Sequence, residues 1–446
     1  MMKMYMYMIM LIIPIINMKF FYLNMFMFNM IILFLFFMIL MFNFSMFYNN
    51  IYYWMGLDLM MFALIMLSIF IIGLMFFTSM NIEKSKIFSL LLLLLLLSLL
   101  LSFSSMNYFM FYLFFEISLL PTFILIMMFG YQPERINASM YMILYTMFAS
   151  LPLLLLIFFL NKMFYSLNYY FMFKNLNYLN ISMLMFYIFM IFAFLVKLPM
   201  FMFHMWLPKA HVEAPISGSM ILAGVMLKLG GYGLYRSMNM MLKLCKKFNI
   251  YLIILNLIGI FMLSILCLRQ NDLKMMVAYS SVVHMSMMLI SLMTLTNLSK
   301  YSMIFMMIGH GFCSPGLFIL VNYIYIRSKS RNLYLNKGMV NIFPSMMLWW
   351  FLFCIGNLGA PMTLNFLSEL FIIMVLLNWS MKLIYLMIIL MIFCSSYSLY
   401  LFSSIFHGNL YSNIKNFYSN KINEFLLMFM LWLPMNLYVL KMDLLI

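Results

Sequence analysis

Charged residues are scarce in this chain of 446 residues, since Asp, Glu, Lys and Arg together make up only 8% of it. A soluble domain averages about 25% charged residues, and a folded soluble protein needs a largely polar exterior. Hydrophobic residues account for 68% of this sequence. The composition therefore excludes a water-soluble globular protein and predicts an integral membrane protein.

Several motifs that would indicate other functions are missing. The five cysteines, an odd number, form no CxxC pair, which argues against disulfides and against cysteine ligands for a metal or an iron–sulfur cluster. No GxGxxG motif follows a predicted strand, so nucleotide binding is not expected. The five histidines do not offer the facing pairs that hold a b-type haem. The sequence thus predicts neither a cofactor nor a metal site in this chain.

Acidic residues are few, so the formal net charge is +16. Lys and Arg in the loops of a membrane protein lie beside anionic lipid, which explains this excess. Nucleic-acid binding would need a basic patch on a soluble face, and the sequence has no segment that could form one. We expect membrane lipids, and no nucleic acid, among its partners.

Apolar runs long enough to span a bilayer recur along the whole chain. Continuous runs such as residues 90–97 lack the alternation of a membrane β-barrel. We therefore expect an all-α polytopic membrane protein with about fourteen transmembrane helices. The expected spans are 2–17, 23–42, 56–78, 86–105, 107–129, 137–160, 181–208, 214–236, 250–268, 273–294, 300–326, 340–377, 382–406 and 424–441.

Two of these spans are predicted to be broken helices. The seventh contains Lys197 and Pro199, and the twelfth is too long for one straight crossing and contains Gly356 and Pro361. These spans are five apart in order. Discontinuous helices at corresponding positions indicate an internal repeat of five helices, with an ion site at the breaks.

Five ionisable side chains are predicted at mid-membrane depth. A carboxylate at the bilayer centre costs at least about 2.5–3.5 kcal/mol, so each such group needs a partner or a proton. Moving an acid and a base together or apart would load or release a proton, which makes the set a candidate proton path. The five residues are Glu116, Lys197, Lys228, His284 and Glu369.

Structural interpretations of the same residues stay open at this point. Glu116 could form a structural ion pair or be a permanently neutral acid. Lys197 and Lys228 could extend to a membrane interface. His284 and His310 could each be a hydrogen-bonded core residue.

Long stretches of the sequence resemble the NADH dehydrogenase subunit 4 family of mitochondrial complex I, whose membrane subunits are antiporter-like. The similarity is collinear from about residue 105 to 405, whereas the two ends match only in hydropathy. The stretches are KLPMFMFHMWLPKAHVEAPISGSMILAGVMLKLGGYG (197–233), FYLFFEISLLPT (111–122), YQPERINA (131–138), LRQNDLKMMVAYSSVVHM (268–285) and NLGAPMTLNFLSEL (357–370).

The resemblance implies a fold of fourteen helices, in which helices 4–8 and 9–13 form two inverted repeats with discontinuous helices 7 and 12. It implies an N-terminal region (1–85), a first repeat (86–238), a second repeat (239–406) and a C-terminal helix (407–446). The proton-path positions of the family fall on Glu116, Lys197, Lys228, His284 and Glu369, and His310 resembles a position often added to that path.

The resemblance also implies a function. The chain would be a non-redox core subunit of the proton-translocating NADH:ubiquinone reductase, with flavin, iron–sulfur clusters and ubiquinone bound by other subunits. Its partners would be other membrane subunits of complex I, especially the antiporter-like subunits 2 and 5, and accessory subunits. The location would be the inner mitochondrial membrane. Independently of the resemblance, the loops opposite the N-terminus carry more Lys and Arg than those on its side, and the positive-inside rule therefore places both termini on the intermembrane-space side. A cation/proton antiporter subunit of the related transporter family is the alternative.

Two residues depart from the family pattern. Pro315 stands in GHGFCSPG, where a small hydroxyl residue is usual, and is expected to kink the eleventh helix. Ala360 replaces a larger residue beside Pro361. Neither departure affects a matched charged position.

Overall fold

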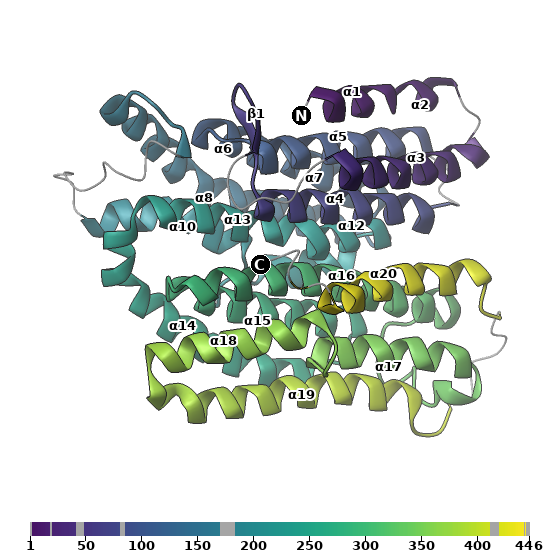
Figure 1. Ribbon diagram of the computed structural model, residues 1–446. Helices are drawn as coiled ribbons and strands as arrows, with labels where there is room; N and C mark the ends of the chain where they lie inside the picture. The colour runs from purple at the N-terminus through teal and green to yellow at the C-terminus, as the bar shows by residue number, and fades with distance from the viewer. Residues whose placement is uncertain are drawn as a thin grey trace. The chain divides into compact units, whose positions relative to one another are not determined.

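The computed structural model describes residues 2–17, 20–41, 49–80, 85–169, 183–410, 419–440 and 442, and they are overwhelmingly α-helical (Figure 1). The chain divides by its internal contacts into two units. The first unit comprises Met1–Lys197 and Glu213–Phe248, and the second comprises Leu198–Val212 and Asn249–Ile446. The predicted domain boundaries are not tested by this division and stay a prediction.

The first unit contains most helices of the N-terminal half and one short hairpin. Its helices α3, α4 and α5 run alongside one another (Figure 1). Its elements are α1 (Met2–Met10), α2 (Ile13–Asn17), α3 (Phe20–Met41), β1 (Asn49–Tyr52), β2 (Met55–Leu57), α4 (Leu59–Thr78), α5 (Ser85–Ser104), α6 (Tyr108–Ile117), α7 (Leu119–Phe129), α8 (Arg135–Phe164), α10 (Met183–Lys197), α12 (Ile216–Ile221), the π-helix η2 (Leu222–Met226) and α13 (Leu227–Met240).

The second unit contains the helices that follow, beginning with the part of α14 (Leu242–Arg269) from Asn249 onward. It also holds most of α11 (Trp206–Glu213), whose last residue belongs to the first unit. Its other elements are α15 (Leu273–Met293), α16 (Asn297–Ser328), the 3-10 helix η3 (Met339–Asn341), α17 (Pro344–Leu358), α18 (Leu364–Trp379), the 3-10 helix η4 (Met381–Leu383), α19 (Ile384–Phe406) and α20 (Ile422–Leu440).

Among the described residues, ten helices are long and apolar enough to span a membrane, and shorter apolar helices such as α10, α17 and α18 supplement them. Several of the long helices expose large apolar side chains, such as Phe148 and Leu155 of α8, which are 73% and 70% exposed. Water would not tolerate so large an apolar surface, whereas lipid or a membrane partner would. The predicted all-α polytopic membrane fold is confirmed, although the ends of some predicted spans lie outside the described residues.

Both predicted helix breaks are present. α10 ends at Lys197, two residues before Pro199, and α11 begins at Trp206. The other break separates α17 from α18, where Gly359 has a φ of +77° and ends α17 in the left-handed conformation. The assignment of these breaks to the fourth span of each of two inverted five-span repeats stays a prediction.

Three local features were not predicted. The β1–β2 hairpin precedes α4. The fifth span is interrupted at Ser118, where Pro121 has no N–H to donate to the carbonyl of Ile117. The eighth span contains the π-helix η2. α16 is one uninterrupted helix that contains Pro315, and the kink expected at this residue stays a prediction.

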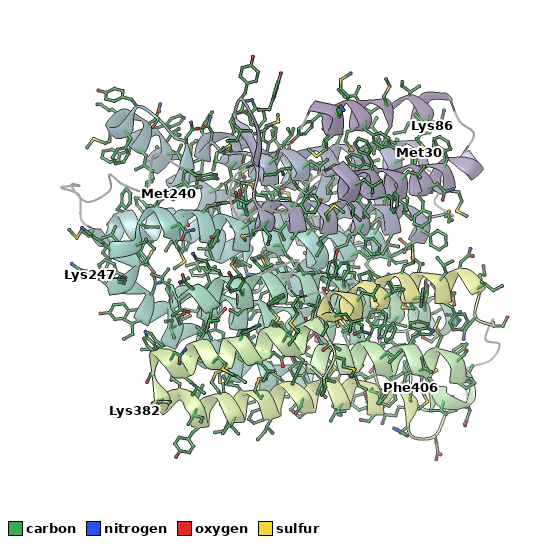
Figure 2. All side chains as sticks on the ribbon, viewed as in Figure 1. Met30, Lys86, Met240, Lys247, Lys382 and Phe406 are labelled. Carbon is green, nitrogen blue, oxygen red and sulfur yellow. The ribbon has the colours of Figure 1, made fainter. Side chains whose placement is uncertain are left out.

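Figure 1 shows α17 and α18 following one another in the second unit, with α19 running alongside both halves of this broken helix. Figure 2 labels Lys382, which lies in η4 just before α19, and Phe406, the last residue of α19, so the two labels mark the ends of this stretch beside the broken helix. α19 can therefore place a side chain beside the break itself.

Candidate functional site

Lys197 lies at the end of α10, and its side chain points into the first unit. It is 2% exposed. Its Nζ donates a hydrogen bond of 3.1 Å to the backbone O of Phe115 and lies 3.4 Å from the centroid of that residue's ring. The cation is therefore held by a carbonyl and an aromatic face, which rules out the interpretation that Lys197 extends to an interface.

Glu116 follows Phe115 at the end of α6. Neither carboxylate oxygen has a hydrogen-bond partner among the described residues, but Lys197 and Ser150 lie close enough to influence its charge. A buried carboxylate without partners is costly, and Lys197 and Ser150 are the neighbours that can compensate the charge of Glu116. The structure thus brings together the predicted residues Glu116 and Lys197.

Lys228 is fully buried on α13. Its Nζ donates a hydrogen bond of 2.5 Å to the backbone O of Ala223, which belongs to the π-helix η2. π-helical turns are frequent at functional sites, and here the wider turn provides the acceptor for a buried cation. Lys228 also does not extend to an interface.

Gly233 explains how α10 approaches the helix that carries Lys228. A Cβ at this position would overlap the ring of Phe194 on α10. Only glycine leaves room for that ring, and α10 and α13 are packed together. The two lysines thus lie on neighbouring helices of one unit.

The second unit contains the other predicted residues. His284 of α15 is fully buried, and its Nδ1 lies 3.9 Å from Oε1 of Glu369 on α18. The rings of His284 and His310 have centroids 5.9 Å apart. Oγ of Ser314 lies 3.4 Å from Nδ1 of His310 and donates to its backbone O at 2.7 Å. These contacts unite His284, His310 and Glu369 in one buried cluster.

Glu369 lies directly beside the break between α17 and α18. A Cβ at Gly359 would overlap its carboxylate, so the glycine that ends α17 also gives the acid its space. Glu369 is 4% exposed, and it lines a cavity of about 470 Å³ whose other walls are mostly apolar side chains of α18 and α19.

Sequence reasoning missed two residues of this cluster. Asn365, one turn before Glu369, donates from Nδ2 to the backbone O of Gly356 at 2.9 Å and so bridges the break. Its buried Oδ1 has no hydrogen-bond partner among the described residues. Tyr397 of α19 places its Oη 3.1 Å from Nε2 of His284. The spacing of Asn365 from Glu369 could have revealed the first, but nothing distinguishes Tyr397 among 30 tyrosines.

Within the described part of the chain, no group of three or more His, Cys, Asp or Glu side chains could hold a metal ion. The arrangement instead consists of buried acids and bases in small groups, of which Lys197 and Glu369 lie beside the two helix breaks. Such groups can exchange protons, because the charge of one depends on the position of the other.

Two known families match this sequence. Residues 105–396 match the family described as "NADH:quinone oxidoreductase/Mrp antiporter, TM". Residues 1–102 match the family described as "NADH-ubiquinone oxidoreductase chain 4, amino terminus".

Similar proteins agree with these matches. "NADH-ubiquinone oxidoreductase chain 4" of Ceratitis capitata is 44% identical over 407 residues, which cover 90% of each chain. The protein of the same name from Aedes aegypti is 50% identical over 331 residues, which cover 74% of this chain and 73% of that one.

The fold resembles membrane subunits in two solved structures. A chain of respiratory complex I from Thermus thermophilus with bound NADH has a TM-score of 0.85 at 19% identity, covering 97% of this chain and 95% of that one. A chain of the Mrp complex from Dietzia sp. DQ12-45-1b has a TM-score of 0.77 at 15% identity, covering 88% and 82%. At these identities the likeness concerns the fold.

Proposed function

This chain belongs to the NADH-ubiquinone oxidoreductase chain 4 family, and we propose that it is the proton-translocating, non-redox subunit of that type in respiratory complex I. NADH oxidation and ubiquinone reduction take place in other subunits, which bind flavin, iron–sulfur clusters and ubiquinone. This chain binds no cofactor of its own and contributes one proton path through the membrane.

The proposal depends on one observation above all: each unit contains a buried acid beside a buried base, next to a discontinuous helix. In the first unit Lys197 ends α10 at the break and approaches Glu116. In the second unit Glu369 lies at the break and approaches His284. Half-helix ends and freed carbonyls at such breaks commonly form ion sites in transporters.

Charge separation within such a pair drives proton movement. When Glu116 and Lys197 are close, both are stabilised as ions, and when they separate, burial favours their neutral forms. A charge arriving from outside the chain would shift this balance, so that Lys197 passes its proton toward Lys228. The proposed path comprises Glu116, Lys197, Lys228, His284, His310 and Glu369.

The energy for this transfer comes from the redox reaction elsewhere in the complex. Moving one charge against the membrane potential costs about 2.3 kcal/mol per 100 mV. We propose outward transfer across the inner mitochondrial membrane, with both chain termini on the intermembrane-space side. The neighbours are other membrane subunits, especially the antiporter-like subunits 2 and 5, together with accessory subunits and lipid.

Replacing Lys228 by methionine tests the path in the assembled complex. Lys228→Met keeps the long side chain and removes the charge that binds Ala223 O. We expect coupled NADH:ubiquinone turnover to fall at least about tenfold, which corresponds to about 1.4 kcal/mol, while assembly persists. Glu116→Gln should act in the same direction.

Lys243→Met is the matched control, because Lys243 is an exposed lysine of α14. It should leave turnover and proton pumping unchanged. Wild-type pumping in the Lys228→Met complex would remove Lys228 from the path.

A cation/proton antiporter subunit is the second candidate, and the fold likeness to the Mrp complex chain favours it. The chain 4 relatives at 44% and 50% identity favour complex I. Blue-native electrophoresis of the native membrane distinguishes the two. Comigration of this chain with NADH-oxidising activity supports complex I, and its migration in a complex without that activity supports the antiporter.

A further inference from the structure

Tyr397 is a buried residue of α19 that contacts the imidazole of His284. Its side chain is 1% exposed, and its Oη lies 3.1 Å from His284 Nε2. The opposite nitrogen of the ring, Nδ1, lies 3.9 Å from Glu369 Oε1. The imidazole is thus placed between a phenol on α19 and a carboxylate on α18.

Titratable side chains face this phenol from several helices of the second unit. Cys394 lies one turn earlier on α19, Cys267 is on α14 and Glu369 is on α18, all close enough to interact electrostatically with Tyr397. On α16, the ring of His310 lies against that of His284. Tyr397 therefore belongs to the same buried cluster as the proposed proton path.

We propose that Tyr397 is a positioning residue, which orients His284 so that Nδ1 faces Glu369 throughout proton transfer. The inference rests on the function proposed above and adds a residue to the machinery of the second unit. Its basis is the geometry of one ring, which is hydrogen-bonded to α19 through Nε2 and has Nδ1 within ion-pair range of Glu369 on α18.

A phenol suits this task because a hydroxyl can both donate and accept. When His284 carries its single proton on Nδ1, Tyr397 donates to Nε2. When the imidazole is doubly protonated, Nε2–H donates to Tyr397 Oη. If the cation then passes its Nδ1 proton to the carboxylate of Glu369, it becomes neutral with the remaining proton on Nε2, still bonded to Tyr397. No proton leaves the phenol in any of these states.

The distance to Glu369 explains why orientation matters. At 3.9 Å, His284 Nδ1 and Glu369 Oε1 are within ion-pair range but too far apart for a hydrogen bond, and a movement of about 1 Å would close the gap. A ring free to rotate would present Nδ1 to Glu369 only part of the time. The contact with Tyr397 restricts that rotation.

Tyr397→Phe in the assembled complex tests the inference, because it keeps the ring and removes only the hydroxyl. We expect coupled NADH:ubiquinone turnover to fall about three- to tenfold, the effect of one lost buried hydrogen bond, and its pH profile to shift, since the hydroxyl contacts a titrating ring. Tyr400→Phe is the matched control, because Tyr400 lies on the same helix and is 37% exposed. An unchanged rate and pH profile in Tyr397→Phe would overturn the inference.

Glu369→Gln separates this inference from the proposed function. If Glu369→Gln abolishes coupled pumping and Tyr397→Phe behaves as wild type, the path stands and the role of Tyr397 falls. If both variants pump normally, the proposed function of this cluster falls as well.

A second measurement needs no variant and decides the matter if Tyr397→Phe does not assemble. A high-resolution structure of the native complex should show Tyr397 Oη within hydrogen-bond distance of His284 Nε2 at both low and high pH. Separation of the two groups at either pH would contradict the inference.

Discussion

The two units place an acid beside a base in different ways. In the first unit the bases are lysines, donors only, and they bind the backbone carbonyls of Phe115 and Ala223. In the second unit the base is His284, a rigid ring held between Tyr397 and Glu369. A lysine has a flexible four-carbon side chain and can move its ammonium group between acceptors. An imidazole can accept a proton on one nitrogen and donate a proton from the other.

Because of this difference, we expect the two units to change their charge states in different ways. The first unit can change its charge state by moving a side chain, which requires a competing acceptor such as a backbone carbonyl. The second unit can change its charge state with little movement, which requires a fixed ring. Three substitutions test this contrast, and they follow in order of decreasing expected effect.

Lys197→Met should have the largest effect. It removes the cation beside Glu116 and leaves a buried carboxylate without compensation, a change that costs about 3–5 kcal/mol in buried pairs. We expect coupled turnover to fall at least about a hundredfold, as measured by NADH oxidation with ubiquinone as acceptor. The double variant Glu116→Gln/Lys197→Met should lose less than the two single variants combined, because the pair acts as a unit.

Lys382→Met is the control for this variant. Lys382 is exposed on η4, just before α19 (Figure 2), and should tolerate the change. Additive losses in the double variant would show that Glu116 and Lys197 are not coupled.

Gly359→Ala should have the next largest effect. Alanine at a φ of +77° costs about 1–2 kcal/mol, and its Cβ would also displace the carboxylate of Glu369. We expect about a tenfold loss of coupled turnover, from the strain and the displaced acid together.

Comparison with Gly408→Ala separates the displacement of Glu369 from the backbone strain, because only the strain is present at Gly408. Gly408 also has a positive φ, of +96°, but the nearest atom to an added Cβ there is 3.9 Å away. This variant should lower the amount of assembled complex slightly and leave turnover per complex unchanged. Equal losses of turnover in the two variants would mean that displacement of Glu369 has no consequence.

Asn365→Ala should have the smallest effect. It removes the hydrogen bond to Gly356 O that bridges the break, worth about 1 kcal/mol, and it also removes the Oδ1 that has no partner. We expect a two- to fivefold loss of coupled turnover. Asn409→Ala, at an exposed asparagine, should cause none, and a larger loss there than in Asn365→Ala would refute the bridging role.

Much of this architecture could be predicted, because the informative residues are rare. Acids and lysines are so few that Glu116, Lys197, Lys228 and Glu369 stood out individually. The breaks could be predicted because glycine and proline are uncommon in this chain and interrupt helices. The roles of these residues in proton transfer stay a proposal.

The residues that were missed depend on contacts between distant segments. Tyr397 reaches His284 across 113 positions, and no local pattern marks it in a chain rich in tyrosine. The π-helix η2 corresponds to no recognisable motif in the sequence. The interruption at Ser118 could have been anticipated from Pro121, because a proline three residues later cannot donate a hydrogen bond within the helix.

The π-helix η2 (Leu222–Met226) has a consequence for the direction of Lys228. A π-helical turn holds more residues than an α-helical turn, in which each residue advances the helix by about 100°. Every side chain after the wide turn is therefore rotated about the axis relative to an uninterrupted α-helix. The direction in which Lys228 points from the helix axis, and that of Gly233, which leaves room for Phe194, therefore depend on the number of residues in that turn more than on their identity.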